Sequence, residues 1–304
     1  MRVVFFGSSS YSATIYEALR DDRDIEVVAV FTQPDKPVGR KKRITPCVMK
    51  QFLLDTEDSV ELFQPKSLKD EGVYESLEAL EPDFIVVASY GQIVPKNILD
   101  ICPPINLHAS LLPEFRGASP IHEVILLERR FTGVSSMYMS EGLDEGDVLG
   151  FRYVEIGRDE SIEELFNKLS VAAATLALST LKEYKKLVRL KQFTPKASYC
   201  KKVKKSDGLL SLNSAMRAYK KYRAFKQWPG VMLENELKLK KVLLASKDGY
   251  YRRGEIVRIE KEWVDIGCDE GFLRVASLQA SGKKEVDAPS YIRGRRLEVG
   301  DTIL

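Results

Sequence analysis

The chain has 304 residues, of which 44% are hydrophobic and 30% are charged, a composition typical of a globular protein with one or two cores. The formal net charge is only +3, so affinity for nucleic acid would have to come from where the charges lie. The four cysteines are scattered, which excludes a zinc-type spacing and a disulfide framework. No apolar run reaches the roughly 18 residues that a membrane helix needs, and residues 1–6 are too short for a signal peptide. We therefore expect a cytoplasmic protein.

The first thirty residues predict the opening of a parallel sheet. Residues 3–6 are apolar on both faces, as in a buried strand, a helical pattern runs from about Ser12, and a second strand covers residues 25–31. This order is typical of an α/β fold with a Rossmann-like, doubly wound, mostly parallel sheet. The turn at residues 7–10 could cradle a phosphate. It lacks the GxGxxG pattern, which favours plain turn chemistry.

Residues 32–46 predict a long loop, because three prolines and a glycine interrupt them and exclude a regular element. The tip of this loop is strongly basic. It could be a solvated loop, or it could contact nucleic-acid phosphates, since clustered cations suit binding that releases counterions. The cations are Lys36, Arg40, Lys41, Lys42 and Arg43.

The alternation of helices and strands continues up to residue 184. In open α/β sheets, ligands bind beyond the carboxyl ends of the strands, so Tyr90, Gly91 and the stretch 106–117 fall on the side where a ligand is expected. We expect helices at residues 48–54, 73–80, 95–101, 118–128 and 161–184, and strands at residues 60–63, 83–89, 105–108, 132–139 and 148–155.

The composition changes between residues 182 and 226, where the many Lys and Arg residues are accompanied by only two acidic residues, Glu183 and Asp207. We place a basic linker at residues 190–206, between a larger domain of residues 1–189 and a smaller one of residues 207–304. Short alternating segments with glycine turns in the smaller domain predict a β-barrel, OB-like, or a sandwich.

The stretch 106–117 contains a polar cluster that suggests chemistry. Asn106 and His108 lie two residues apart on an extended segment and so point to the same face. The amide can stabilise an oxyanion, and the imidazole can donate or take a proton near neutral pH. Asp144, in a glycine-flanked turn, is the best candidate for a carboxylate that pairs with His108. Without a serine or cysteine nucleophile, this set suggests direct attack by an external amine or water.

Each of these residues also has a structural interpretation. A single strand histidine is usually a core residue, and an aspartate between glycines commonly serves the turn. Ser110 is a possible nucleophile, but no G-x-S-x-G elbow surrounds it. Arg116 could bind an anion or form a salt bridge. His122, on the helix that follows, is expected at the surface or beside the site.

Several motifs together resemble the methionyl-tRNA formyltransferase family over nearly the full chain. Residues 106–113 (Asn-Leu-His-Ala-Ser-Leu-Leu-Pro) and 116–121 resemble the hallmark of transferases that use 10-formyltetrahydrofolate. Residues 142–147 resemble the acidic turn of that family. Residues 32–46 resemble the loop that lies beside the acceptor arm in the tRNA enzymes, and residues 223–230 and 292–297 resemble signatures of the C-terminal domain.

The resemblance implies transfer of a formyl group from 10-formyltetrahydrofolate, a co-substrate, to the α-amino group of methionine on initiator tRNA, for translation initiation. It implies Asn106, His108 and Asp144 as the catalytic residues, with no metal and no obligate protein partner. The implied folate site comprises Ser110, Leu111, Leu112 and Pro113 with Tyr90 and Gly91. The implied tRNA contacts are Lys36, Arg40, Lys41, Lys42, Arg43, Lys201, Lys202, Lys204 and Lys205.

The chain departs from the family pattern after Gly7, where serines replace the usual Thr-Pro pair, at His122, which is usually glutamine, and at Glu114-Phe115. Two alternatives remain open. A formyltransferase for glycinamide ribonucleotide or an amino sugar is one, although the glycinamide enzyme would not need residues 207–304 or the basic loop. A protein that only binds tRNA is the other, and it would leave Asn106, His108 and Asp144 without a role.

Overall fold

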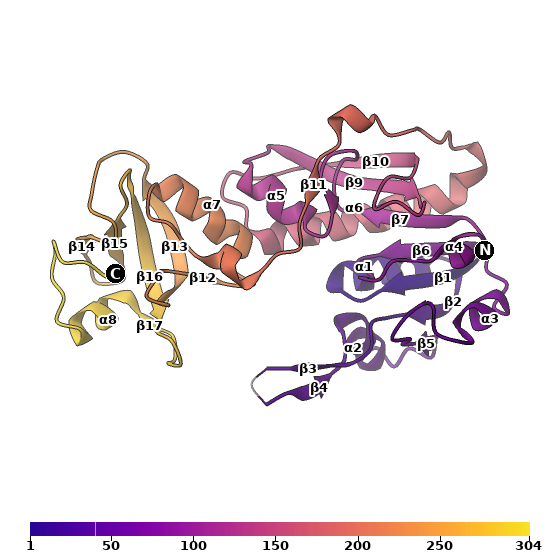
Figure 1. Ribbon diagram of the computed structural model, residues 1–304, viewed down its shortest axis with the longest axis horizontal. Coiled ribbons are helices and arrows are strands. Elements are labelled where there is room, and N and C mark those ends of the chain that lie inside the picture. Colours follow the sequence, from indigo (N-terminus) through magenta and orange to yellow (C-terminus); the bar gives the residue numbers. More distant parts are fainter. Residues whose placement is uncertain (40) are drawn as a thin grey trace. The chain divides into compact units, whose positions relative to one another are not determined.

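The computed structural model describes residues 1–39 and 41–304, which form two compact units (Figure 1). Unit 1 comprises Met1–Pro120, Arg130–Ile156 and Glu164–Cys200, and unit 2 comprises Ile121–Arg129, Gly157–Glu163 and Lys201–Leu304. None of the helices in the described part of the chain is long and apolar enough to cross a membrane.

Unit 1 is built on a seven-stranded sheet of order β10-β9-β7-β6-β1-β2-β5. The five strands from β5 to β7 are parallel, and β9 and β10 are antiparallel. The predicted doubly wound, mostly parallel sheet is thereby confirmed. The strands are β1 (Arg2–Gly7), β2 (Glu26–Phe31), β5 (Glu61–Phe63), β6 (Phe84–Ala88), β7 (Pro104–His108), β9 (Phe131–Tyr138) and β10 (Val148–Glu155).

Helices cover both faces of this sheet because its central strands are apolar on both faces. Phe5 packs against Tyr16 of α1, with ring centroids 5.8 Å apart, whereas Phe6 points to the opposite face and stacks on Phe31 at 4.6 Å. Leu77 of α3 and Ile98 of α4 belong to the same buried cluster as Phe6. The helices of unit 1 are α1 (Ser10–Arg20), α2 (Val48–Asp55), α3 (Val73–Glu78), α4 (Lys96–Leu99) and most of α6 (Ile162–Glu183). The helix α5 (Pro120–Leu126) belongs to unit 2 apart from its first residue.

The turn at residues 7–10 joins β1 to α1 closely. A Cβ at Gly7 would lie 2.4 Å from Ser12 Cβ, so only glycine allows this approach. Ser9 caps the helix by accepting from the Ser12 N–H, and Ser12 Oγ donates to the Ala88 carbonyl at 2.6 Å. The serine groups are used within the protein, in agreement with plain turn chemistry.

The prediction of an irregular loop at residues 32–46 is wrong. Residues on either side of the tip form a hairpin of β3 (Lys36–Val38) and β4 (Arg43–Thr45), in which Pro37 lies opposite Ile44. Proline is tolerated here because each strand of a two-stranded ladder is an edge strand, and both strands are exposed along their whole length. Arg40 lies outside the described residues.

Unit 2 contains a six-stranded antiparallel sheet of order β12-β13-β16-β15-β14, with β17 paired to β16. Its core includes Ile256, Val264, Leu273 and Val275, all fully buried. The predicted small C-terminal domain of short β-strands, OB-like barrel or sandwich, is thereby confirmed as an antiparallel β domain. Its strands are β12 (Val231–Met232), β13 (Lys238–Ser246), β14 (Ile256–Ile259), β15 (Val264–Gly267), β16 (Phe272–Gln279) and β17 (Val286–Asp287), and two helices that the sequence did not predict accompany them, α7 (Ala215–Phe225) and α8 (Ala288–Gly294).

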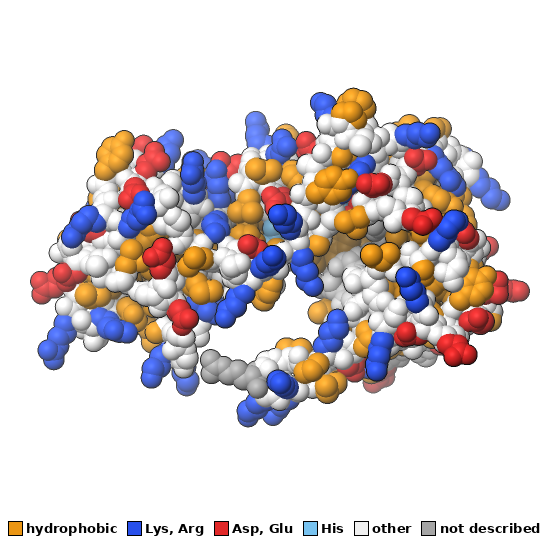
Figure 2. Space-filling view, in the orientation of Figure 1, with side chains coloured by type: hydrophobic (Ala, Val, Ile, Leu, Met, Phe, Trp, Pro, Cys, Tyr) orange, Lys and Arg blue, Asp and Glu red, His pale blue; other side chains and the backbone are white. Residues whose placement is uncertain are grey.

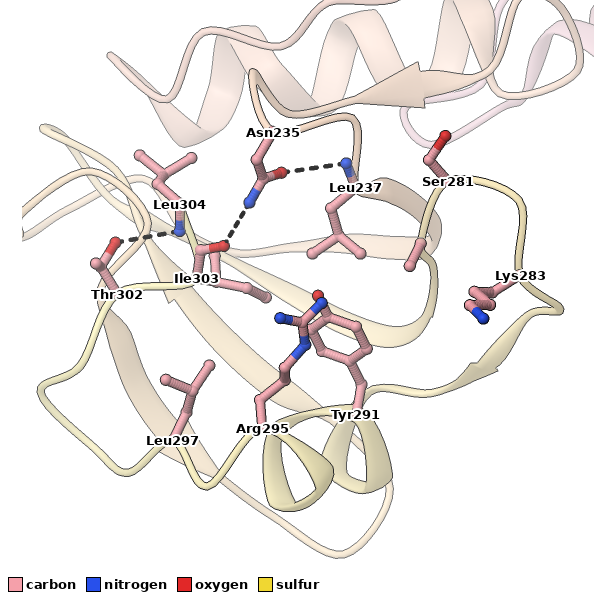
Figure 3. A pocket seen from close by; sticks show the side chains of 11 residues that line it. Asn235, Leu237, Ser281, Lys283, Tyr291, Arg295, Leu297, Thr302, Ile303 and Leu304 are labelled. Atoms are coloured by element: carbon pink, nitrogen blue, oxygen red, sulfur yellow. Dashed lines mark hydrogen bonds between the residues drawn. The ribbon is translucent and has the colours of Figure 1, made fainter.

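A pocket of about 550 Å³ lies in unit 2 beside α8 (Figure 3). Tyr291 and Arg295, both from α8 and its end, extend into it, and Lys283 lies at its side. On the opposite wall, Asn235 Nδ2 donates to the Ile303 carbonyl at 2.8 Å. The pocket thus combines an aromatic ring with two cations.

Candidate active site

The carboxyl end of β7 brings Asn106 and His108 to the edge of the sheet in unit 1. The neighbouring strand β9 ends at Tyr138, whose N–H donates to the Asp147 carbonyl at 2.8 Å. This bond folds residues 139–147 back along the strand end. A Cβ at Gly146 would lie 1.8 Å from the Tyr138 carbonyl oxygen, so the turn requires glycine there. The fold-back carries Asp144 to the end of β7.

The three residues predicted to be catalytic meet at the Asp144 carboxylate. Asn106 Nδ2 donates to Oδ1 at 3.3 Å, and His108 Nδ1 lies 3.6 Å from Oδ2. The Gly117 N–H also donates to Oδ2, at 2.7 Å. His108 is 7% exposed and Asp144 is 8% exposed, so this cluster is shielded from bulk solvent.

The histidine orientation follows from its other nitrogen. His108 Nε2 lies 2.9 Å from the Phe115 carbonyl oxygen, and because a carbonyl only accepts, Nε2 must carry hydrogen. In the neutral ring, Nδ1 is then the nitrogen that can take a proton, and it faces Asp144. Asn106 keeps one amide hydrogen and its carbonyl oxygen without a protein partner in the part of the chain that the structure describes. These are the groups available to a substrate.

The segment of residues 110–113 is a tightly held loop. Ser110 Oγ donates to the Glu114 carbonyl at 2.6 Å. Ser135 of β9 pins the loop, because its hydroxyl donates to the Ser110 carbonyl at 2.6 Å and accepts from the Leu112 N–H at 2.9 Å. The Leu112–Pro113 peptide is cis, and Leu112 packs against Met137. The Ser110 hydroxyl therefore shapes the loop, which argues against a nucleophilic role.

Tyr90 and Gly91 follow β6 and differ in exposure. The Tyr90 ring lies in the hydrophobic core, edge-on to Phe6 at 5.1 Å, and burial raises the pKa of its hydroxyl. Gly91 is exposed and has φ +84°. A ligand at this strand end would therefore contact the backbone at residues 90–91 and not the tyrosine ring.

Those predicted tRNA-contacting cations that the structure describes are exposed and lie on both units. Lys and Arg side chains gather on the β3–β4 hairpin (Figure 2), and Asp35, at its base, is already paired with Lys50 at 2.8 Å. The side-chain amine of Lys36 donates to Gln33 Oε1 at 2.9 Å and has no carboxylate partner among the described residues. The other exposed cations of this set are Lys41, Lys42, Arg43, Lys201, Lys202, Lys204 and Lys205.

Other cations of the basic stretch 182–226 have structural partners. Lys182 pairs with Asp22 in unit 1, and Lys220 pairs with Glu128 in unit 2. Arg223 is buried, and its guanidinium donates to the Glu160 carbonyl at 2.9 and 2.8 Å. The folded stretch therefore carries fewer unpaired positive charges than its sequence suggests.

His122 is half-buried. It lies in unit 2, where its ring stacks on Phe225 with centroids 5.6 Å apart. Burial lowers the pKa of His122 to about 4, and Asp207 opposes this shift. The ring is therefore neutral at neutral pH and serves packing.

Arg116 forms a salt bridge, one of its two predicted roles. Only 2% of it is exposed, and Nη1 lies 3.2 Å from Glu145 Oε1 and 2.9 Å from the Tyr199 hydroxyl. Its Nε and Nη2 donate to Gln192 Oε1 at 3.0 and 2.8 Å. The sequence reasoning missed Gln192 and Tyr199, because nothing local in a basic, proline-containing segment marks them as neighbours of residue 116.

A further connection that the sequence did not predict holds the loop after His108. β8 (Arg116–Gly117) pairs with β11 (Tyr199–Cys200) in a short parallel ladder. Ser198 Oγ accepts from the Phe115 N–H at 2.9 Å. Across the described residues, no group of His, Cys, Asp and Glu side chains is arranged to hold a metal ion.

Comparison with known proteins identifies the class to which this fold and site belong. The family described as "Formyl transferase" matches residues 1–181, and "Formyl transferase, C-terminal domain" matches residues 202–296. Among solved structures, the chain resembles the sugar 3N-formyl transferase WlaRD, solved with dTDP and 5-N-formyl-THF (TM-score 0.65, 16% identity, 93% of this chain and 99% of that chain). It also resembles HypX from Aquifex aeolicus in complex with tetrahydrofolic acid (TM-score 0.65, 16% identity, 96% and 47%). At these identities, the two structures show the fold alone.

Sequence relatives are much more similar. A methionyl-tRNA formyltransferase of Wolinella succinogenes is 49% identical over 303 residues, covering 100% of this chain and 99% of the relative. One from Nitratiruptor sp. is 47% identical over 302 residues, covering 99% of each. The chain belongs to the methionyl-tRNA formyltransferase family.

Proposed function

We propose that Asn106, His108 and Asp144 form the catalytic centre for transfer of the formyl group of 10-formyltetrahydrofolate to the α-amino group of methionyl initiator tRNA. The observation that carries this proposal is the convergence of an amide, an imidazole and a carboxylate on one shielded point. The reaction itself follows from the family to which the chain belongs.

In this mechanism the amine attacks the formyl carbon, and negative charge develops on the formyl oxygen. The second amide hydrogen of Asn106, which has no partner among the described residues, stabilises this oxyanion. Removal of such an interaction from other enzymes lowers kcat by about 10²–10³-fold. His108 takes at Nδ1 the proton that the attacking amine loses, and the tetrahedral intermediate collapses when the bond between the formyl carbon and the folate nitrogen breaks. At 3.6 Å, Asp144 stabilises the imidazolium electrostatically but is too far away to hold this proton in a hydrogen bond. The proton therefore remains available to the oxyanion or the departing folate nitrogen.

The folate co-substrate is proposed to bind along residues 110–113 and at Tyr90 and Gly91. The rigid loop pinned by Ser135 supports this placement, because a preformed wall requires no ordering when the ligand binds. Gly91 offers exposed backbone at the carboxyl end of a parallel strand, where ligands of open α/β sheets bind.

The tRNA is proposed to contact the β3–β4 hairpin and the lysines at residues 201–205. These cations are exposed, and in the described residues none of them is paired with a carboxylate. We also propose that the C-terminal domain contributes tRNA contacts, supported by the pocket in which Tyr291 could stack on a base near Arg295 and Lys283.

For the domain organisation we propose a catalytic domain of residues 1–189, a basic linker of residues 190–206 and a tRNA-binding domain of residues 207–304. The first part of that linker packs on the catalytic domain through Gln192 and Cys200. We further propose that the reaction takes place in the cytoplasm, with tRNA and folate as its only required partners.

The test incubates the protein with 10-formyltetrahydrofolate and methionyl initiator tRNA and measures the gain of one CO on the methionine by mass spectrometry. Methionyl elongator tRNA, glycinamide ribonucleotide and a dTDP-linked amino sugar are the comparison substrates. We expect transfer to the initiator tRNA and its loss in His108→Ala. An absence of transfer, or an unchanged His108→Ala variant, would refute the proposal, and preferential transfer to an amino sugar would favour the alternative branch.

A further inference from the structure

The side-chain amide of Gln192 lies between the two loops that form the site. Its Oε1 accepts from Arg116 Nε at 3.0 Å and from Nη2 at 2.8 Å. Its Nε2 donates to the Asp144 carbonyl and to the Gly146 carbonyl, both at 2.8 Å. Both amide hydrogens and both lone pairs of the oxygen are therefore used, which is the full capacity of a glutamine side chain.

Both loops bound by Gln192 contact the candidate catalytic residues directly. On one side, Arg116 lies between Phe115, whose carbonyl accepts from His108 Nε2, and Gly117, whose N–H binds Asp144 Oδ2. On the other side is the backbone of Asp144 itself. The separation of these loops determines how far the carboxylate stands from the imidazole.

The Asp144 backbone needs such support. Its φ is +52°, a left-handed conformation that costs a non-glycine residue about 1–3 kcal/mol and persists only where its surroundings fix it. The bond from Gln192 Nε2 to the Asp144 carbonyl acts on this peptide unit. The second bond, to Gly146, holds the point at which the turn touches the end of β9.

We infer that Gln192 is a positioning residue for formyl transfer, which acts by holding the Asp144 turn and the Arg116 loop at a fixed separation. The inference rests on the proposed catalytic role of Asp144. It assigns a function to a residue outside the motifs that mark the site, in a segment that the sequence suggests is a linker. Gln192 touches neither reacting group, so its whole effect passes through Asp144 and its neighbours.

Two variants separate the two halves of the amide. Gln192→Glu keeps oxygen acceptors for Arg116 but loses both donors to the carbonyls of residues 144 and 146. Gln192→Leu loses both sets of bonds. We expect each to lower kcat by about 10-fold to 100-fold, the range that small misplacements of catalytic groups produce, and to change KM for tRNA and for the folate by less than about 3-fold.

A purely structural role is distinguished by combining the variants with Asp144→Asn. If Gln192 acts through Asp144, Gln192→Leu should have little further effect on single-turnover transfer in the Asp144→Asn background, because coupled residues are non-additive. Gln51→Leu, on the exposed face of α2, is the matched control and should leave kcat unchanged in both backgrounds. Thermal unfolding of every variant is recorded, and if Gln192→Leu does not fold, Gln192→Glu carries the same comparison.

An unchanged kcat in both Gln192 variants would overturn the inference, as would an equal fold-loss in the wild-type and Asp144→Asn backgrounds. Failure of the underlying function gives a different result, namely no formyl transfer by the wild-type chain. Transfer that depends on His108 but not on Gln192 would leave the proposed function standing and remove only this inference.

Discussion

Replacing Asp144 by asparagine tests the charge at the centre of the site with little change of shape. Asparagine tolerates the left-handed conformation that residue 144 adopts, so the turn should keep its course. The substitution removes the negative charge that lies 3.6 Å from His108 Nδ1. Two unit charges at that separation interact by roughly 4–5 kcal/mol at an effective dielectric constant of about 20.

An interaction of this size corresponds to a rate factor of about 10³ if it exists only when the imidazole is charged. The asparagine amide can replace part of it, so we expect kcat to fall by about 10²–10³. The KM values for tRNA and for 10-formyltetrahydrofolate should change by less than about 3-fold, because this interaction strengthens only as His108 takes its proton.

The assay is steady-state formylation of methionyl initiator tRNA, with thermal unfolding measured in parallel. Glu141→Gln is the control, since it removes the same charge from an exposed position of the same turn and should retain wild-type kcat. A kcat within a few-fold of wild type for Asp144→Asn would show that the carboxylate serves only the turn. Unfolding of Asp144→Asn at the assay temperature would equally contradict the prediction, because the turn is expected to keep its course.

Three other perturbations test separate parts of the molecule. Replacing Lys41, Lys42 and Arg43 by glutamine should weaken tRNA binding and reduce the slope of log K against log salt by roughly 2–3, as measured by filter binding. The kcat at saturating tRNA should be retained. An unchanged slope would exclude these residues from the contact. Arg223→Met should lower the free energy of unfolding in urea by about 2–4 kcal/mol, because it removes the hydrogen bonds that the buried, charged guanidinium donates to the carbonyls of Gly157 and Glu160. Arg217→Met on the exposed face of α7 should have little effect. His122→Phe should reduce the loss of stability at acid pH. In the folded wild type, the pKa of His122 is about 4, below its ordinary value of 6.5. The wild type therefore keeps its full free energy of unfolding above pH 6.5 and loses on the order of 1–3 kcal/mol as the pH falls to about 4. If urea unfolding shows the same decrease in stability between pH 6.5 and 4 for the wild type and the variant, His122 does not cause that decrease.

Local patterns in the sequence predicted the elements that carry the site. The buried strands β1 and β6 are apolar on both faces, and the spacing of Asn106 and His108 on an extended segment correctly placed both side chains toward Asp144. These predictions succeeded because each depends on a few consecutive residues. The helix α7 was missed because it lies in the basic stretch of residues 182–226, which was interpreted by its charge alone, although Ala218 and Tyr219 on its other face are buried.

Other features depend on partners far away in the chain. The prolines of residues 32–46 argued against a strand, because a proline cannot donate to a strand ladder. Pro37 is nevertheless accommodated in β3, because β3 is paired on one side only. Lys220 counted as free charge because its partner, Glu128, lies 92 positions earlier in the sequence. The ladder between β8 and β11 joins residues 83 positions apart, and no window of sequence contains both strands.

The backbone strain at the site explains why these distant contacts matter. Phe115 and Asp144 have φ of +59° and +52°, at a combined cost of about 2–6 kcal/mol. Ser198 accepts from the Phe115 N–H, and Gln192 donates to the Asp144 carbonyl. Each such bond contributes about 0.5–1.5 kcal/mol, so the two together contribute about 1–3 kcal/mol, which covers only the lower part of the strain range. The β8–β11 ladder and the hydrogen bonds of the buried Arg116 also stabilise these two conformations. The geometry of His108 and Asp144 is therefore set by residues 192–200 as much as by the motifs that contain them.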